Sequence, residues 1–322
     1  MLLMTIFGGA ALVLAAIGIY GLLGYSVQHR TQEIGIRMAL GAQADKVRWS
    51  IVGQGMTLVG LGIVMIYPLL WMLSASVKPS TQVFTDTGLI PSDWALDNYA
   101  EGWNALSQPF HVYLGNSLLI AGLTILGNML SCSMAAYAFS RLRFTGKRLM
   151  FALMMGTMLL PGQVVLIPQY IIFSKLGWLN TYLPLTIPAF FATNAFFIFL
   201  LVQFMRNLPM ELQEAAKIDG AGAFRTYWSV ILPLTTPAMA TVAIFTFIAS
   251  WGDFFGPLLY LTDPKLFTVP LALKEFVSST GASAWGPMFA MSVVSLVPVV
   301  AFFFIGQRYL ISDAPGQRLR RS

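Results

Sequence analysis

The sequence predicts an all-α protein that forms a polytopic bundle of membrane helices, and three observations support that prediction. Hydrophobic residues make up 57% of the 322 residues and charged residues only 10%, whereas a soluble domain carries about 25% charged residues. Seven stretches stay apolar over the roughly 20 residues that a helix needs to cross a bilayer. The charged side chains gather in the segments between these stretches.

The seven predicted membrane spans lie near residues 3–27, 54–76, 114–139, 149–172, 182–205, 232–251 and 286–307. The first has no basic segment before it and is long enough to cross the membrane, so we expect a retained helix rather than a cleaved signal peptide. The prolines in or beside the central spans are Pro161, Pro168, Pro184 and Pro188. Such prolines are tolerated where neighbouring groups satisfy the freed backbone carbonyls.

The distribution of Lys and Arg predicts the orientation of the chain in the lipid bilayer. One set of loops, together with the C-terminal tail, holds 15 of the 19 basic residues, and the opposite side holds 4. Because basic loops stay in the cytoplasm, we expect residues 206–231 and the C-terminus to be cytoplasmic and the N-terminus to be extracytoplasmic. The net charge of +6 is spread over short loops, which does not indicate a nucleic-acid partner.

A polar segment between two charge-free stretches, residues 209–237, reads PMELQEAAKIDGAGAFRTYWSVILPLTTP. Pro209 suits the first position of a helix, where its missing N–H costs no hydrogen bond. Glu211 and Glu214 follow in the first turns, where the helix dipole favours carboxylates. Gly220 is expected to end this helix, because glycine adopts the left-handed conformation of a C-terminal cap without a steric penalty.

A second helix is expected to begin near Gly222. Its apolar residues at the spacing i, i+3, i+4 and i+7, which predicts one apolar stripe, are Phe224, Tyr227, Trp228 and Ile231. The whole segment is therefore predicted to be a helix–turn–helix that lies across the membrane face. The small side chains of Ala215 and Ala216 would let another backbone approach closely.

The spacing within this segment resembles the EAA loop of ATP-binding-cassette importer permeases. The triplet EAA at 214–216 is followed after three residues by Gly220, and after nine more by VILP at 230–233. Val230 stands where the family usually has isoleucine. The resemblance implies a coupling loop over residues 206–231 that docks on a cytoplasmic ATPase. The residues that it assigns to ATPase coupling are Glu211, Glu214, Ala215, Ala216, Asp219 and Gly220.

From about residue 64 to the C-terminus the chain resembles sugar-type importer permeases. The stretch LLPGQVVLIPQYIIFSKLGWLNTYLPLTIP at 159–188 most favours a carbohydrate importer over an amino-acid or peptide importer. The resemblance implies a permease domain over residues 61–322, with about six transmembrane helices in the inner membrane. It also implies, as partners, a second permease subunit, two copies of a cytoplasmic ATPase, an extracytoplasmic solute-binding protein and a sugar substrate. The tail SDAPGQRLRRS departs from the family pattern.

Residues 1–60 resemble a different family, the exporter-like permeases of the macrolide-exporter and lipoprotein-release type. The resemblance lies in FGGAALVLAAIGIYGLLGYSVQHRTQEIGIRMALGAQ at residues 7–43. It implies one extra N-terminal transmembrane helix with a cytoplasmic loop. Because only one helix and one loop of that family are present, we interpret the segment as a passenger left by a gene fusion rather than as a second working coupling element.

The sequence contains no catalytic constellation and no nucleotide-binding loop. The two histidines, His29 and His111, are predicted to lie at opposite membrane faces, so they cannot share a metal ion. The Gly-Lys pair at 146–147 lacks the upstream glycine and the following hydroxyl residue of a P-loop. We therefore expect a transport subunit that is not an enzyme, needs no cofactor or metal, and takes its energy from a partner ATPase.

The sequence also disfavours coupling to an ion gradient. The middles of the predicted spans contain no Asp, Glu, Lys or Arg, and ion-driven carriers need such groups within the membrane. Sugar sites usually combine aromatic faces with polar groups. The candidates for the substrate pathway, near helix interruptions or the outer ends of spans, are Gln163, Gln169, Asn194, Trp251 and Asp253.

The sequence therefore predicts the membrane-spanning permease subunit of an ATP-driven, binding-protein-dependent sugar importer that works by alternating access. Two alternatives stay open. One is an exporter-like or mechanotransmission permease subunit, which the first 60 residues favour. The other is an importer permease for a solute that is not a sugar. A channel or secondary carrier is disfavoured by the uncharged spans.

Overall fold

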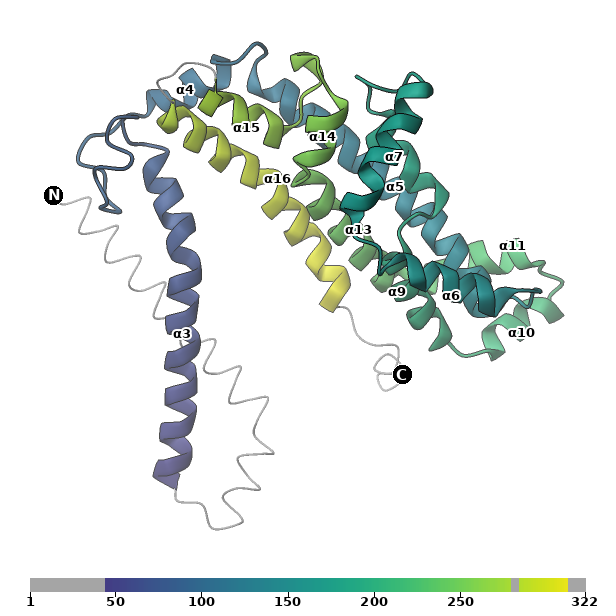
Figure 1. Ribbon diagram of the computed structural model, residues 1–322. Coiled ribbons are helices and arrows are strands. Elements are labelled where there is room, and N and C mark those ends of the chain that lie inside the picture. Colours follow the sequence, from purple (N-terminus) through teal and green to yellow (C-terminus); the bar gives the residue numbers. More distant parts are fainter. Residues whose placement is uncertain (1–43, 279–283, 312–322) are drawn as a thin grey trace. The chain divides into compact units, whose positions relative to one another are not determined.

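The computed structural model describes residues 44–278 and 284–311, and within those ranges every regular element is a helix (Figure 1). This confirms the all-α prediction for the described chain. The chain divides into two compact units, residues 1–74 and 75–322. The predicted span 3–27 lies outside the described residues.

The described part of the first unit is one long helix, α3 (Ala44–Ala75). It contains almost all of the predicted second span and begins before it. The final stretch of α3, Val64–Ala75, is an apolar helix. The predicted domain boundary near residue 60 therefore falls inside a continuous helix, and the division into 1–60 and 61–322 stays a prediction.

The second unit is built around α5 (Phe110–Arg141), a helix of 32 residues. It packs along α9 (Ala195–Arg206) and α13 (Thr236–Trp251), while α16 (Trp285–Ile311) packs against α13 (Figure 1). Both α5 and α16 are long and apolar enough to cross a membrane. The predicted third and seventh spans are thus confirmed.

Shorter helices lie at the two ends of α5. At the Phe110 end, α5 contacts α4 (Asp97–Asn104), α15 (Val269–Ser278) and the short 3-10 helix η3 (Pro264–Leu266). The helix α14 (Phe255–Tyr260) precedes η3 in the chain. The polar segment 209–237 lies near the Arg141 end of α5 (Figure 1). This segment and the short helices at the Phe110 end therefore lie at opposite ends of the second unit.

Two clusters of buried apolar side chains join these helices. The cluster nearer Arg141 includes Cys132, Tyr137, Phe197, Leu201 and Met239. The cluster nearer Phe110 includes Phe110, Tyr113, Phe247, Trp251 and Met291. Lipid tails are as apolar as these side chains, so close packing rather than a hydrophobic drive orders helices in a membrane.

Gly127 lets α5 touch the backbone of a neighbouring segment. A Cβ atom at Gly127 would lie 2.9 Å from Cδ2 of Phe190 and 3.0 Å from the carbonyl carbon of Ala189. One turn further on, Ser131 Oγ donates a hydrogen bond of 2.6 Å to the Ala189 carbonyl oxygen. A residue without a side chain at this crossing permits the close approach that membrane helices use for packing.

The predicted fifth span is a broken helix rather than a continuous one. It consists of α8 (Leu183–Thr186), the 3-10 helix η1 (Ile187–Phe191) and α9, and the three together have the length and hydropathy of a membrane span. Ala192 interrupts them with a positive φ of 54°. Asn194 then caps α9, because its Oδ1 accepts a hydrogen bond of 3.1 Å from the N–H of Phe197.

The predicted fourth span, 149–172, is not a single helix. The chain forms α6 (Lys147–Thr157) and α7 (Gly162–Lys175), which residues 158–161 separate. Pro161 lies directly before α7. Proline disfavours a helical backbone in the residue that precedes it and has no N–H to donate, so the apolar run divides at this point.

The predicted sixth span, 232–251, is bent. The helical segments 223–234 and 236–251 meet at an angle of 77°, and α12 (Leu232–Leu234) ends at the bend. Thr235 occupies the break, where its Oγ1 donates a hydrogen bond of 2.8 Å to the Leu232 carbonyl oxygen. The backbone N–H of Thr235 donates to the same oxygen over 3.1 Å, so Thr235 pairs this carbonyl group twice at the break.

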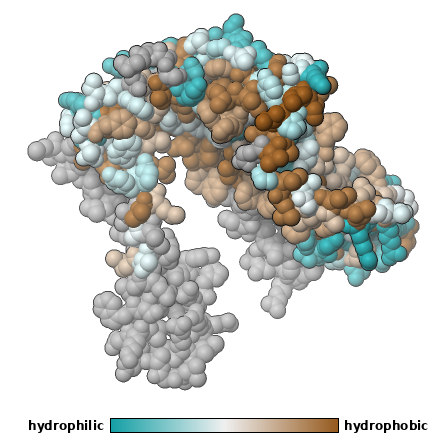
Figure 2. Space-filling view, in the orientation of Figure 1, coloured by the Kyte–Doolittle hydropathy of each residue, from teal (hydrophilic) through white to brown (hydrophobic). Residues whose placement is uncertain are grey.

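Within the described residues, three helices are long and apolar enough to cross a membrane, or four if the bent pair counts as one span. Figure 2 shows hydrophobic surface across much of the second unit, with hydrophilic residues gathered along the upper rim and at the lower right tip. This distribution is that of a bundle whose sides contact lipid and whose ends contact water.

Candidate functional site

The polar segment 209–237 forms a short helix and a tight turn. The helix α10 (Glu211–Ile218) has two glutamates in its first turn. Gly220 follows with a φ of 77°, the left-handed conformation that glycine adopts without strain. The predicted helix stop at Gly220 is thus confirmed, although the helix starts at Glu211 rather than at Pro209.

One face of α10 is open to solvent, and the other packs against this chain. Gln213 and Ala216 are buried, whereas the side chain of Ile218 is 86% exposed. The coupling residues predicted from the sequence that are exposed are Glu211, Glu214, Ala215, Asp219 and Gly220. Successive residues of a helix point in different directions. Ala216 is therefore covered by its own chain, and the close approach of another backbone at Ala215 stays a prediction.

The second helix differs from its prediction. It begins as α11 (Ala223–Thr226) and continues as the π-helix η2 (Tyr227–Ile231). The first and last residues of η2 are buried, but Phe224 and Trp228 are 72% and 52% exposed, with their rings stacked 6.4 Å apart. The wider turn of a π-helix departs from the period of 3.6 residues. The predicted single stripe therefore divides into a buried pair and an exposed pair.

A recess of about 230 Å³ lies between α5, α9 and α13. We call it the polar recess. Its polar lining residues are Thr124, Asn128, Asn194, Thr246, Ser250, Asp253 and Thr268. The first two belong to α5 and are one helical turn apart, which places them on the same face of that helix.

Hydrogen bonds fix several of these side chains within the polar recess. Asn128 Nδ2 donates to Thr246 Oγ1 over 3.3 Å and so joins α5 to α13. Asp253 Oδ1 accepts a bond of 3.0 Å from the N–H of Gly256. The hydroxyl group of Thr268 is buried and has no hydrogen-bond partner within the described structure. The polar recess therefore offers donors and acceptors at fixed positions.

The structure brings together only part of the predicted substrate pathway. Asn194 and Asp253 both line the polar recess. Trp251 is buried elsewhere, where its ring stacks on Phe247 at 5.4 Å. Gln169 is exposed on α7 and lies apart from the residues that line the recess. The side chain of Gln163 lies outside the described structure.

Sequence reasoning missed Thr124, Asn128, Thr246 and Thr268. One signal was available for the α5 pair, because Thr124 and Asn128 are polar residues at i and i+4 within a long run without charged residues. No comparable signal links them to Thr246 or Thr268, which lie more than a hundred residues further along the chain. The packing of α5 against α13 brings Thr246 to the recess, and the contact of α5 with α15, which begins directly after Thr268, brings Thr268 there.

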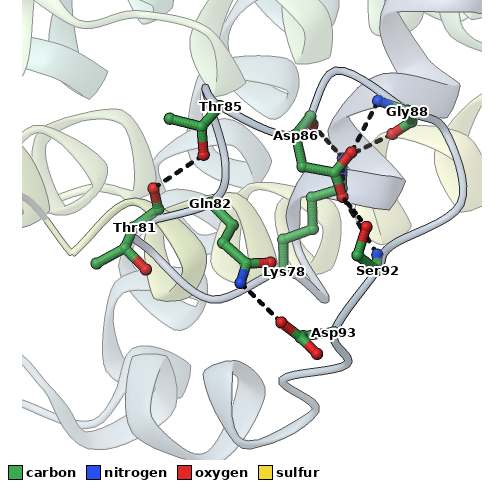
Figure 3. A network of polar contacts seen from close by, with 8 residues as sticks. All are labelled: Lys78, Thr81, Gln82, Thr85, Asp86, Gly88, Ser92 and Asp93. Carbon is green, nitrogen blue, oxygen red and sulfur yellow. Dashed lines mark hydrogen bonds and ion pairs between the residues drawn. The ribbon is translucent and has the colours of Figure 1, made fainter.

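A buried lysine organises the loop 78–93 at the opposite end of the unit (Figure 3). Lys78 is 1% exposed, and its Nζ donates to the carbonyl oxygens of Asp86 and Gly88, each at 2.6 Å. The same Nζ lies 3.6 Å from the carboxylate of Asp86. Hydrogen bonds from the N–H groups of Ser92 and Gly88 hold the pKa of Asp86 below its usual value. The loop therefore has a defined internal structure.

Comparison with known proteins identifies the family. Residues 127–313, more than half of the chain, match the family described as the binding-protein-dependent transport system inner membrane component. The chain belongs to this family. Residues 5–146 of the permease also match the family described as FtsX-like permease C-terminal, which accords with the exporter-like resemblance of its first 60 residues.

The permease is similar to several curated transport proteins. It is 34% identical to the trehalose/maltose transport system permease protein MalG of Thermococcus litoralis, over 81% of this chain and 93% of that protein. It is 31% identical to the diacetylchitobiose uptake system permease protein NgcG of Streptomyces coelicolor, over 84% and 89%. The sn-glycerol-3-phosphate transport system permease protein UgpE of Yersinia enterocolitica is 33% identical, over 80% and 92%.

Solved structures contain the same fold. A chain of a bacterial ABC transporter involved in the import of the acidic polysaccharide alginate superposes with a TM-score of 0.73 at 23% identity, over 83% of the permease and 98% of that chain. A second structure, of an alginate transporter in complex with its pentasaccharide-bound periplasmic protein, gives a TM-score of 0.58 at 14% identity. The permease is thus a multi-pass membrane protein with an ABC permease fold.

Proposed function

We propose that this permease carries a sugar across the inner membrane as one subunit of an ATP-driven importer. Its family consists of membrane components of binding-protein-dependent transport systems. Two relatives are named for trehalose and maltose and for diacetylchitobiose, which supports a sugar substrate. A third is named for sn-glycerol-3-phosphate, so a phosphorylated polyol is the alternative solute.

The exposed face of α10 is the observation that carries the coupling role. A short helix at the end of the bundle presents Glu214 and the apolar side chain of Ile218 to solvent, a combination that suits docking on another protein. We assign this face to a cytoplasmic ATPase. The contact residues are Glu211, Glu214, Ala215, Asp219 and Gly220, and Ala216 holds α10 against its own chain.

Orientation follows from this assignment. If α10 meets a cytoplasmic ATPase, the Arg141 end of α5 is cytoplasmic and the Phe110 end is extracytoplasmic. The basic residues agree with this arrangement, since Arg141, Arg143, Arg206 and Arg225 all lie in segments near α10. The loop 78–93 then faces the solute-binding protein that the family requires.

We propose that the polar recess contacts the sugar during passage. Its amide, hydroxyl and carboxylate groups match the alternating donors and acceptors of sugar hydroxyl groups. Asn194 and Asp253 remain candidates for contact with the substrate. Asn128, Thr246 and Thr268 join them as further candidates. We assign the rest of the pathway to a second permease subunit.

The proposed cycle is alternating access. ATP binding closes a dimer of two ATPase copies and moves α10 of each permease. The two permeases then rock relative to each other, so that the cavity between them opens toward the solute-binding protein and receives the sugar. ATP hydrolysis and product release return the cavity to the cytoplasmic side. The permease itself catalyses no reaction in this scheme.

Charge reversal at Glu214 tests the coupling role. In the reconstituted complex, Glu214→Lys is expected to lower ATP-driven sugar uptake at least about tenfold, because an exposed interface charge of the wrong sign costs several kcal/mol. Glu101→Lys is the matched control, since Glu101 is exposed on α4 at the other end of the unit. The measurements are labelled-sugar uptake and co-purification of the ATPase. Equal uptake and equal co-purification for the two variants would show that α10 is not part of the interface with the ATPase.

A second candidate function is favoured by one observation, the match of residues 5–146 to FtsX-like permeases. In that case the chain would be a mechanotransmission subunit, which passes ATPase movement across the membrane without carrying a solute. The two functions differ in a direct assay. An importer complex takes up labelled sugar in proteoliposomes with ATP and the binding protein, whereas in a mechanotransmission complex the partner ATPase hydrolyses ATP without any uptake.

A further inference from the structure

Arg141 occupies a position that neither the coupling loop nor the polar recess explains. It is the last residue of α5 and is only 7% exposed. Its Nη2 donates hydrogen bonds to the carbonyl oxygen of Met205 and, over 2.6 Å, to that of Leu208. Its Nη1 lies 2.7 Å from the sulfur of Met210. One guanidinium group thus reaches three points of the connection between α9 and α10.

The two carbonyl groups that Arg141 binds lie in and just after the last turn of α9. Carbonyl groups at a helix C-terminus have no intrahelical partner and carry the negative end of the helix dipole. A cation placed there is stabilised by the dipole as well as by the hydrogen bonds. The planar fork of arginine reaches two carbonyls at once, a geometry that the single ammonium group of lysine does not reproduce.

The same guanidinium also touches Met210, the residue directly before α10. The carbonyl oxygen of Met210 accepts hydrogen bonds from the N–H groups of Gln213 and Glu214, at 2.9 and 3.1 Å. Met210 is therefore part of the first turn of α10, and the contact with its sulfur ties Arg141 to that turn. A shift of α10 relative to α5 must break or stretch these contacts.

The backbone of α10 packs mainly on other neighbours. Its principal helix contacts are with η2 and α11. Between α10 and the end of α5 lies a recess of about 390 Å³, whose lining includes Tyr137, Arg141, Gln213 and Lys217. The connection from α10 to α5 across this opening consequently depends on the side chain of Arg141.

Buried polar atoms around this opening are not all paired. Within the described structure, Arg141 Nε, Tyr137 OH and Gln213 Oε1 are buried without a hydrogen-bond partner. An opening lined by polar groups is one in which water can exchange partners as helices move. Arg141 therefore holds its two carbonyl bonds beside an opening whose other buried polar groups are not all paired.

We propose that Arg141 is a positioning residue that transmits the displacement of α10 to α5. The inference rests on the proposed function, because it takes α10 as the element that the ATPase moves. Its consequence is specific, since α5 also carries Thr124 and Asn128 into the polar recess. Movement passed through Arg141 thus reaches the groups proposed to contact the sugar.

The test compares Arg141→Gln and Arg141→Lys in the full complex with ATPase and binding protein. The readout is the ratio of ATP hydrolysis with the loaded binding protein to hydrolysis without it, alongside ATPase co-purification. Arg141→Gln is expected to co-purify the ATPase and to lower the ratio at least about tenfold, because bonds to a charged group are among the stronger ones in a protein. Arg141→Lys keeps the positive charge but loses the planar guanidinium group that reaches two carbonyl oxygens at once. It should restore part of the wild-type ratio.

Arg148→Gln is the matched control, because Arg148 is an exposed arginine in the first turn of α6, directly after the connection from α5. It should leave the ratio unchanged. The proposal is overturned if Arg141→Gln keeps the wild-type ratio, or if both Arg141 variants lose the ATPase in equal measure, which would make Arg141 purely structural. A wild-type complex that shows no stimulation by any binding protein would instead defeat the proposed importer function, and this inference with it.

Discussion

At the scale of single residues, backbone conformation and burial decide what each residue of the polar segment 209–237 can contribute. Gly220 has a φ of 77°, while Gly222, two residues later, has a φ of −69°. The N–H of Gly220 also donates to the Lys217 carbonyl oxygen over 3.0 Å. Only the first of these two glycines therefore occupies a position that requires glycine.

This difference gives a matched pair of proline substitutions. Gly220→Pro forces φ to about −65° and removes a hydrogen bond, so it is expected to lower sugar uptake at least about tenfold while membrane insertion stays normal. Gly222→Pro matches the observed φ and should keep most of the uptake. The measurements are uptake in proteoliposomes and the amount of each variant in the membrane. Similar losses in both variants would show that the turn at Gly220 is not required.

At the scale of elements, α5 is the helix on which the second unit depends, and its glycines are not equivalent. Gly127 faces η1 so closely that a Cβ atom would press on Phe190 and Ala189. Gly122 belongs to the same helix, and a Cβ atom there would meet nothing within 4 Å. The contact between α5 and η1 therefore depends on one glycine.

Alanine at each position tests this contact. Gly127→Ala is expected to destabilise the solubilised permease by about 1–3 kcal/mol, because the added methyl group overpacks a closed interface. Gly122→Ala should be neutral or stabilise the helix by up to about 1 kcal/mol. Thermal unfolding in detergent measures both. A Gly127→Ala variant as stable as Gly122→Ala would mean that η1 moves away without cost.

At the scale of the whole molecule, the described spans lack the charged groups that ion coupling uses. The charged residue of α5 is Arg141, at its end and engaged with carbonyl groups, α13 has none, and α16 has Arg308 close to its C-terminal end. In the proposed function, energy for transport reaches the permease through α10 instead. The polar recess holds one carboxylate, Asp253, whose Oδ1 accepts a backbone hydrogen bond.

Uptake is therefore expected to require ATP and to be indifferent to imposed proton or sodium gradients. Proteoliposomes that contain the whole complex and the binding protein measure this directly. ATP is supplied either inside or outside the vesicles, and ionophores are added to collapse the proton and sodium gradients. Sugar accumulation driven by an ion gradient without ATP would contradict the importer assignment.

Truncation tests whether the first part of the chain takes part in transport. A chain that starts at Ala44, where α3 begins, with an added initiator Met, is expected to assemble and to keep uptake within about twofold of the full chain. The reason is that a helix in lipid gains little from nonspecific association with others. Complex assembly and uptake are compared with those of the full chain. A truncated chain that inserts but does not assemble would make the passenger interpretation wrong.

The sequence alone determined the class of the protein and its local structure at several points. Apolar stretches of membrane length, the turn at Gly220 and the spacing of the EAA segment depend on neighbouring residues, so they are readable from the chain. The break at Pro161 was missed, although its cause is equally local. The apolar stripe after Gly222 was only half right, because the π-helix there changes the period.

The tertiary structure decided which residues meet. Asn128 bonds to Thr246, which is 118 positions away, and Arg141 binds Leu208, which is 67 positions away. Trp251, a candidate for the substrate pathway from the sequence, is buried in the apolar cluster nearer Phe110 and does not line the polar recess. Helix packing is fixed by side-chain shape over whole surfaces rather than by short patterns, so no local signal specifies these contacts. For that reason the importer family and the EAA segment are predictable from the sequence, while the polar recess and the contacts of Arg141 follow only from the packing of α5.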